Sequence, residues 1–149
     1  YSQSVNMVNA PFLARERGIE VREIRNEREG VYHTLLRITV ETSQGSRSVA
    51  GTLFANGAPR LVEMFGIAIE ADLEGSMLYI SNTDMPGFIG SVGALLGEAE
   101  INIGTFHLGR REAGGEAILL LSVDSPVPAE LIEKIAKVRN VKRVQPLSF

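Results

Sequence analysis

The stretch that decides the fold covers residues 77–102 and reads MLYISNTDMPGFIGSVGALLGEAEIN. Its first four residues form an apolar run of the kind found in buried strands. After a polar turn, Ile89, Val92 and Leu96 recur at the spacing of one helix face. Pro86 and Gly87 stand between strand and helix, and we expect both in the first helical turn. A helix start of this kind leaves backbone N–H groups that can bind an anion.

Strand and helix patterns alternate through the rest of the C-terminal half. Two strands are predicted over 103–111 and 117–123, a helical stripe of Leu131, Ile132, Ile135 and Val138 follows, and a strand over 141–147 closes the chain. The resulting order is strand, helix, strand, strand, helix, strand. This order predicts a ferredoxin-like fold, with two helices on one face of a four-stranded antiparallel sheet.

The N-terminal half reads as mainly antiparallel sheet with a helix. The helix is predicted from about Ala10 to a stop at Gly18, and a short strand contains Val21 and Ile24. Further strands are expected over 32–42, 47–55, 60–65 and 67–73. A break at residues 74–76 separates the halves. We therefore predict an α+β chain with one domain over 1–75 and another over 76–149.

Composition limits the classes of function. The chain has 149 residues, a net charge of -3 and no basic stripe, so we expect no nucleic-acid partner. No apolar run approaches the ~20 residues of a membrane span and no signal peptide is recognisable, so we expect a cytoplasmic protein. The absence of cysteine excludes disulfides, thiolate catalysis and cysteine zinc sites.

Motifs of catalysis are also missing. The sequence contains no dinucleotide fingerprint, no phosphate-binding P-loop and no G-x-S-x-G elbow. The two histidines, His33 and His107, lie in different halves without a second histidine at metal-ligand spacing. We therefore expect no catalytic residue and no metal site in this chain.

Three polar side chains accompany the predicted helix start. Asp84 can accept from an ammonium group, whereas Asn82 and Asn102 offer both donors and acceptors. An α-amino acid needs this mixture beside its carboxylate. The alternative is purely local, with Asp84 as an N-cap and Asn82 as a turn residue.

Several short motifs, in this order, resemble known sequences. Residues 82–87 (NTDMPG), 100–103 (EINI) and 114–117 (GGEA) resemble the C-terminal ACT domain of bacterial D-3-phosphoglycerate dehydrogenases, a sensor domain for amino acids. Residues 8–11 (VNAP) and 51–54 (GTLF) resemble the intervening domain found in the long form of that enzyme. The resemblance covers essentially the whole chain. It implies a regulatory part without cofactor, whose parent enzyme uses NAD in catalytic domains of the same polypeptide.

The resemblance also implies a serine site shared by two ACT domains of a homodimer or homotetramer. The carboxylate of L-serine would meet backbone amides at the helix start, where Pro86 contributes none, and its ammonium would meet Asp84. Asn102 would come from the second subunit. Some relatives carry His and Asn where this sequence has Asn82 and Asp84. The predicted effector residues are Asn82, Asp84, Pro86, Gly87, Phe88 and Asn102.

A second site is implied less directly. The intervening domain of the family is credited with binding phosphate-bearing anions, and the matching basic position is Arg60. A second basic position of some relatives corresponds to Asp72, whose carboxylate repels a phosphate. Two functions therefore stay open for the chain, an L-serine-binding module for feedback inhibition and a purely structural oligomerisation module.

Overall fold

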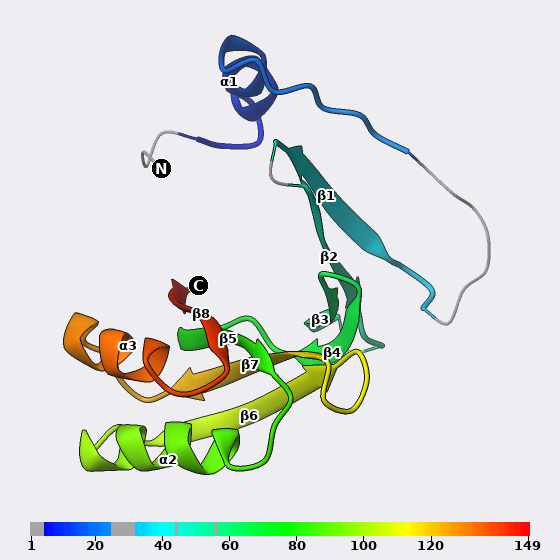
Figure 1. Ribbon diagram of the computed structural model, residues 1–149. Helices are drawn as coiled ribbons and strands as arrows, with labels where there is room; N and C mark the ends of the chain where they lie inside the picture. Colours follow the sequence, from blue (N-terminus) through cyan, green and yellow to red (C-terminus); the bar gives the residue numbers. More distant parts are fainter. Residues whose placement is uncertain (1–4, 25–31, 44, 56) are drawn as a thin grey trace. The chain divides into compact units, whose positions relative to one another are not determined.

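The computed structural model of the protein describes residues 5–24, 32–43, 45–55 and 57–149 (Figure 1). Contacts within the chain divide it after Val31 into two compact units. The intervening domain predicted over 1–75 is thus not a single compact unit by contacts. The proposed boundary at residue 75 stays a prediction.

The described part of the first unit, residues 5–24, contains one short helix. Helix α1 is Ala10–Glu16, and Pro11 is tolerated because it lies in the first turn. The helix ends as predicted before Gly18, whose φ of 67° is left-handed, and the Ile19 amide donates to the Ala14 carbonyl at 2.9 Å. The predicted strand around Val21 and Ile24 was wrong. Residues 19–24 form no strand in the described part of this unit, because no neighbouring strand is there to pair with them.

The second unit begins with an antiparallel meander, called here the first sheet. Its strands, in sequence and spatial order, are β1 (Leu36–Thr42), β2 (Gly45–Leu53), β3 (Pro59–Met64) and β4 (Ile67–Ala71). All four were predicted, although β1 begins later and β4 ends earlier than expected. Strands β3 and β4 are joined by Phe65 and Gly66, both with positive φ, which is the geometry of a tight type I′ hairpin turn.

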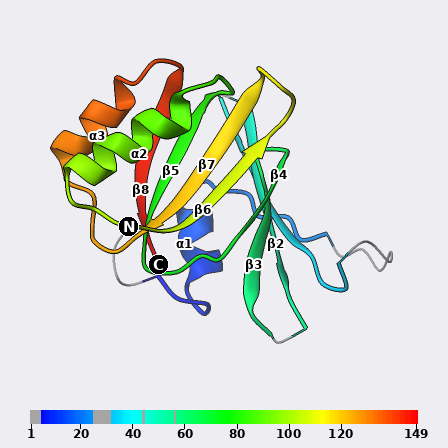
Figure 2. The same cartoon turned by 90° about the horizontal axis from the view of Figure 1, so that it is seen from below.

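The second sheet follows the predicted order of elements. Its strands are β5 (Ser76–Thr83), β6 (Ile103–Arg110), β7 (Glu116–Val123) and β8 (Val141–Ser148), arranged β6-β7-β5-β8 with every pair antiparallel. Helices α2 (Phe88–Glu98) and α3 (Ala129–Ala136) cover one face (Figure 2). The α+β prediction and the ferredoxin-like fold are confirmed.

Two cores lie on opposite faces of the second sheet. Helix residues Val92, Leu96 and Ile135 are fully buried against Leu78 and Ile80 of β5, among other strand residues. The other face is covered mainly by β3 and β4 of the first sheet, through a cluster of Leu61, Met64, Ile67, Ile69, Ala71, Met77, Tyr79, Ile118 and Leu120. The central strands β5 and β7 are therefore buried on both sides, which explains their nearly continuous apolar runs.

The contact between the two sheets is close at Gly109 of β6. A Cβ atom there would lie 2.5 Å from the Ala68 carbonyl oxygen and 2.9 Å from Cγ2 of Ile67. Only glycine lets β4 approach β6 to this distance.

Among the described residues, no helix is both long and apolar enough to cross a membrane.

Candidate functional site

The β5–α2 loop, where the sequence predicts an anion site, differs from the expectation in one respect. Gly87 is the N-cap of α2 and has a left-handed φ of 88°, so Pro86 and Gly87 precede the first helical turn instead of lying in it. The first helical bond runs from the Ser91 amide to the Gly87 carbonyl at 3.0 Å. The amides of the first turn, such as those of Ile89 and Gly90, consequently have no acceptor within the helix. This end of α2 favours a negatively charged group.

Asn82 lies beneath this helix start. It follows Leu78 and Ile80 at every second position of β5, so its side chain lies with theirs on the helix-covered face, where it is 1% exposed. Its Nδ2 donates to the Thr83 carbonyl at 2.9 Å, whereas Oδ1 is buried and has no hydrogen-bond partner among the described residues. An unpaired buried acceptor costs about 1–3 kcal/mol. Asn82 is thus a buried polar residue and not the turn residue of the local alternative.

Asp84 is an anchor of the loop. Its Oδ2 accepts from Nη1 of Arg110 at 2.8 Å and from the Gly114 amide at 3.4 Å, and its own amide donates to the Gly115 carbonyl at 2.8 Å. The hydrogen bond from Arg110, followed by that from the Gly114 amide, lowers the pKa of the Asp84 carboxyl. The carboxylate is therefore ionised at neutral pH, and Oδ1 remains for a further donor. Asp84 is not an N-cap, because α2 has no side-chain cap.

Asn102 lies far from these groups within one chain. It follows α2, whose 11 residues correspond to about 16 Å of helix. Its Nδ2 donates to Oδ2 of Asp124 at 3.0 Å, and the Asp124 amide donates back to the Asn102 carbonyl at 3.3 Å. Asp124 thus orients Asn102 and leaves the Asn102 Oδ1 as an acceptor. The structure brings Asn82 and Asp84 together at the start of α2 but leaves Asn102 at its other end.

Strand β6 connects the two ends of the site along an open edge. It is the outermost strand of the second sheet and pairs with β7 alone. Phe106 and Leu108, on its helix-covered face, are 39% and 40% exposed, and Ile89 of α2 is 48% exposed. We call these three residues the edge patch. Half-exposed apolar side chains beside unpaired backbone groups are typical of a surface that pairs with another strand.

The predicted site residues omitted Arg110 and Asp124. Strand register contains the signal for Arg110, because Asn82 lies opposite Ala117 and Ala117 lies opposite Arg110, forming one row across three strands. Asp124 lies immediately after β7 and next to the start of β6, so its contact with Asn102 is also a consequence of register. Neither contact is local in sequence, and motif reading alone does not reveal it.

Arg60 is engaged by another partner. Its Nη1 forms an ion pair with Oδ2 of Asp72, and its guanidinium lies 5.4 Å from the centre of the Phe54 ring. An anion would have to compete with the Asp72 carboxylate, so an anion site at Arg60 stays a prediction.

Within the described ranges, no group of three or more His, Asp or Glu side chains is arranged to hold a metal ion.

Known families match both parts of the chain. Residues 1–65 match the D-3-phosphoglycerate dehydrogenase intervening domain, and residues 76–140 match the ACT domain. Similar proteins include the D-3-phosphoglycerate dehydrogenases of Methanocaldococcus jannaschii, 39% identical over 94% of this chain and 26% of the relative, and of Bacillus subtilis, 34% identical over 95% of this chain and 27% of the relative. That of Synechocystis sp. is 36% identical over 94% of this chain and 25% of the relative.

The chain spans about a quarter of the length of these curated relatives. Its two matched ranges follow one another in the order that the sequence motifs predicted. The chain therefore carries an intervening domain of the D-3-phosphoglycerate dehydrogenase family followed by an ACT domain.

Proposed function

We propose that the ACT domain of this chain binds L-serine and thereby provides feedback inhibition of a D-3-phosphoglycerate dehydrogenase. The catalytic domains, with their NAD chemistry, belong in this proposal to the rest of that enzyme. The helix start at Gly87 offers amides to the carboxylate of an amino acid, and the Asp84 Oδ1 is an acceptor for its ammonium group. Both halves of a zwitterion thus find a counterpart within one short loop.

The third group, Asn102, is supplied by a second copy in this proposal. Antiparallel pairing of two β6 strands about a twofold axis brings the start of one strand next to the end of the other. With the axis near the middle of β6, the Ile103 end of one copy lies beside the Arg110 end of the second. Asn102 of one copy then approaches Arg110 and Asp84 of the other, and the same pairing covers the edge patch of both copies.

One observation carries this proposal. The groups that fit an amino acid lie at opposite ends of an open edge strand, so twofold pairing of that strand joins them twice and creates two equivalent sites. A monomer leaves each half of the site incomplete. Binding and pairing are therefore expected to strengthen each other.

Calorimetric titration of the chain with L-serine, together with its mass by light scattering, tests the proposal. Saturable heat at one L-serine per chain and the mass of a dimer or a larger even-numbered assembly are expected. D-Serine is the matched control, because it carries the same groups in the mirror arrangement, and it should bind far more weakly. No heat from L-serine, or a monomer mass in its presence, would contradict the proposal.

The structural alternative has one observation in its favour. The edge patch alone is a reason for two copies to pair, and it needs no effector. Under this alternative the chain is a dimer that releases no heat with L-serine, and the Asp84 ion pair only holds the loop. The same two measurements therefore distinguish the two functions.

A further inference from the structure

The β6–β7 loop, residues 111–115, is attached to the amino-acid loop on one side. Asp84 donates its amide to the Gly115 carbonyl at 2.8 Å and accepts from the Gly114 amide at 3.4 Å. Arg110, the last residue of β6, adds its ion pair with Asp84 at 2.8 Å. A ligand that binds the Asp84 carboxylate, or a substitution that removes its charge, therefore alters the hydrogen bonds that hold this loop.

The same loop is attached to the first sheet on its other side. Nη2 of Arg111 donates to the Phe65 carbonyl at 3.0 Å, and a Cβ atom on Gly66 would lie 3.5 Å from the same nitrogen. Arg110 and Arg111 are neighbours in sequence, yet one binds the amino-acid loop and the other binds the β3–β4 turn. A displacement of the backbone between them changes both contacts.

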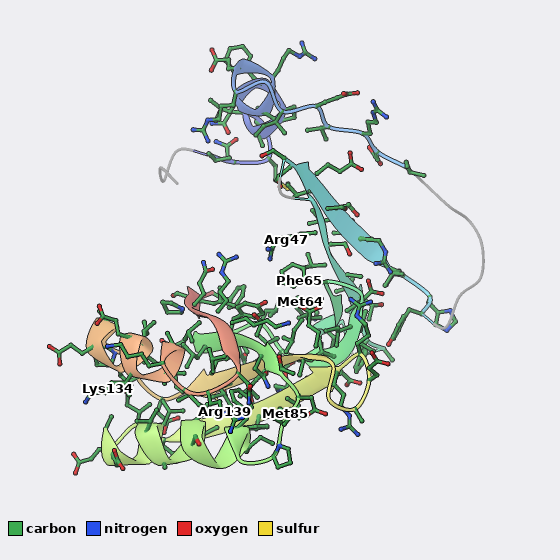
Figure 3. The ribbon with its side chains drawn as sticks, viewed as in Figure 1. Arg47, Met64, Phe65, Met85, Lys134 and Arg139 are labelled. Atoms are coloured by element: carbon green, nitrogen blue, oxygen red, sulfur yellow. The ribbon has the colours of Figure 1, made fainter. Side chains whose placement is uncertain are left out.

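The β3–β4 turn depends on such contacts. Phe65 has a φ of 54°, a left-handed conformation that is unfavourable for a bulky side chain. Its ring lies 5.2 Å from the guanidinium of Arg47 and packs edge-to-face against Tyr79 at 6.1 Å, and Figure 3 labels both Phe65 and Arg47 beside the turn. A strained turn held by side-chain contacts responds to the loss of one of them.

We propose that the β6–β7 loop couples the amino-acid site to the first sheet, with Arg111 as the residue that carries the coupling from Asp84 to Phe65. The ligand part of this inference rests on the proposed function, because L-serine would be the group that changes the occupancy of Asp84. The other part, called here the mechanical part, is the coupling between Asp84 and Phe65 in the ligand-free chain, and it rests only on contacts within that chain. A ligand shifts such an element only if it binds its two arrangements with different affinity.

Amide hydrogen exchange in the ligand-free chain tests the mechanical part. The reporters are the Gly114 amide, bound to Asp84, and the Phe65 amide, which donates to the Ser48 carbonyl at 2.7 Å. Asp84→Asn should speed exchange at both reporters. The expected change is about fivefold, equivalent to ~1 kcal/mol of easier local opening. In an Arg111→Gln background, Asp84→Asn should still affect Gly114 but no longer Phe65.

Glu116→Gln is the matched control. It removes the long ion pair between Arg111 and Glu116, at 3.9 Å, without touching the bond to Phe65. In its background the effect of Asp84→Asn on the Phe65 amide should persist. If Arg111→Gln does not fold, Arg111→Lys, which keeps the charge but shortens the reach, serves in its place. An unchanged Phe65 amide in Asp84→Asn, or an equal change with and without Arg111, would overturn the coupling.

Addition of L-serine separates this inference from the proposed function. Coupling predicts that L-serine slows exchange at both reporters in the unmodified chain and at Gly114 alone in Arg111→Gln. Binding heat with an effect at Gly114 only would refute the coupling and leave L-serine binding intact. Absence of any binding heat would refute the proposed function, whereas the coupling would still be decided by the ligand-free variants.

Discussion

A mixture of two defective chains should restore L-serine binding. Asn102→Ala removes the hydrogen bond that the Asn102 Oδ1 accepts from the ligand, since Nδ2 already donates to Asp124, and leaves a polar ligand group unpaired. The expected loss is ~1–3 kcal/mol, or roughly 5- to 150-fold weaker binding. Asp84→Asn should weaken binding by at least as large a factor, because the ammonium loses its nearby counter-charge. Each variant alone carries the defect in every site.

A mixed dimer has a different arrangement. One of its two sites takes Asp84 from the Asn102→Ala chain and Asn102 from the Asp84→Asn chain, so it contains no substitution. The other site carries both. After mixing under conditions that exchange subunits, titration with L-serine should show wild-type affinity for about one quarter of all chains, because random exchange makes half of the dimers mixed. Recovery would be absent if Asn102 served the site of its own chain, and that result would refute the shared site.

Three further outcomes are expected. Gly109→Ala should lower the free energy of unfolding by about 1–3 kcal/mol in urea denaturation, because a Cβ atom at this position has no room against β4. Gly90→Ala, at an exposed position of α2, is the control and should not destabilise the chain. Equal free energies of unfolding for the two variants would contradict the close packing of the two sheets. Because the pKa of Asp84 is lowered in the folded chain, its ion pair stabilises the fold fully above the pKa of an unfolded aspartate, about 4, and this contribution is lost as the pH falls through the folded pKa. The free energy of unfolding of Asp84→Asn, measured by urea denaturation at a series of acidic pH values, should therefore fall less steeply with decreasing pH than that of the unmodified chain. Asp124→Ala should weaken L-serine binding without slowing exchange of subunits, because it only releases the orientation of Asn102; calorimetry with unchanged affinity would exclude that role.

The ferredoxin-like half could be predicted well because its signals are local and agree with one another. Helix α2 shows apolar residues at one face, β5 and β7 contain apolar runs over 77–80 and 117–121, and short turns separate these elements. The start of α2 was placed too early, because proline in a first turn is a general preference, whereas the left-handed Gly87 depends on this particular loop. Val21 and Ile24 have strand propensity, but a strand also needs a partner.

The candidate site was less accessible to sequence reasoning. The types of residue were read from the loop itself, but the environment of Asp84 depends on Arg110, 26 positions away. The same holds for Arg60, whose charge is neutralised by Asp72 from the end of the first sheet. Charge pairs across strands depend on register, and register depends on the whole sheet.

The packing of the first sheet against one face of the second determines where this chain can be truncated for experiments. A cut at residue 76, where the ACT match begins, would strip one face of the second sheet and expose Met77, Tyr79, Ile118 and Leu120 to water. Such a piece would be prone to self-association through this exposed apolar face, independently of any ligand. A piece beginning at Tyr32 keeps the covering strands, so its self-association would report on the edge strands that the folded unit leaves open, among them β1 and β6. Family boundaries and folding boundaries differ in this chain, and expression plans are better guided by the latter.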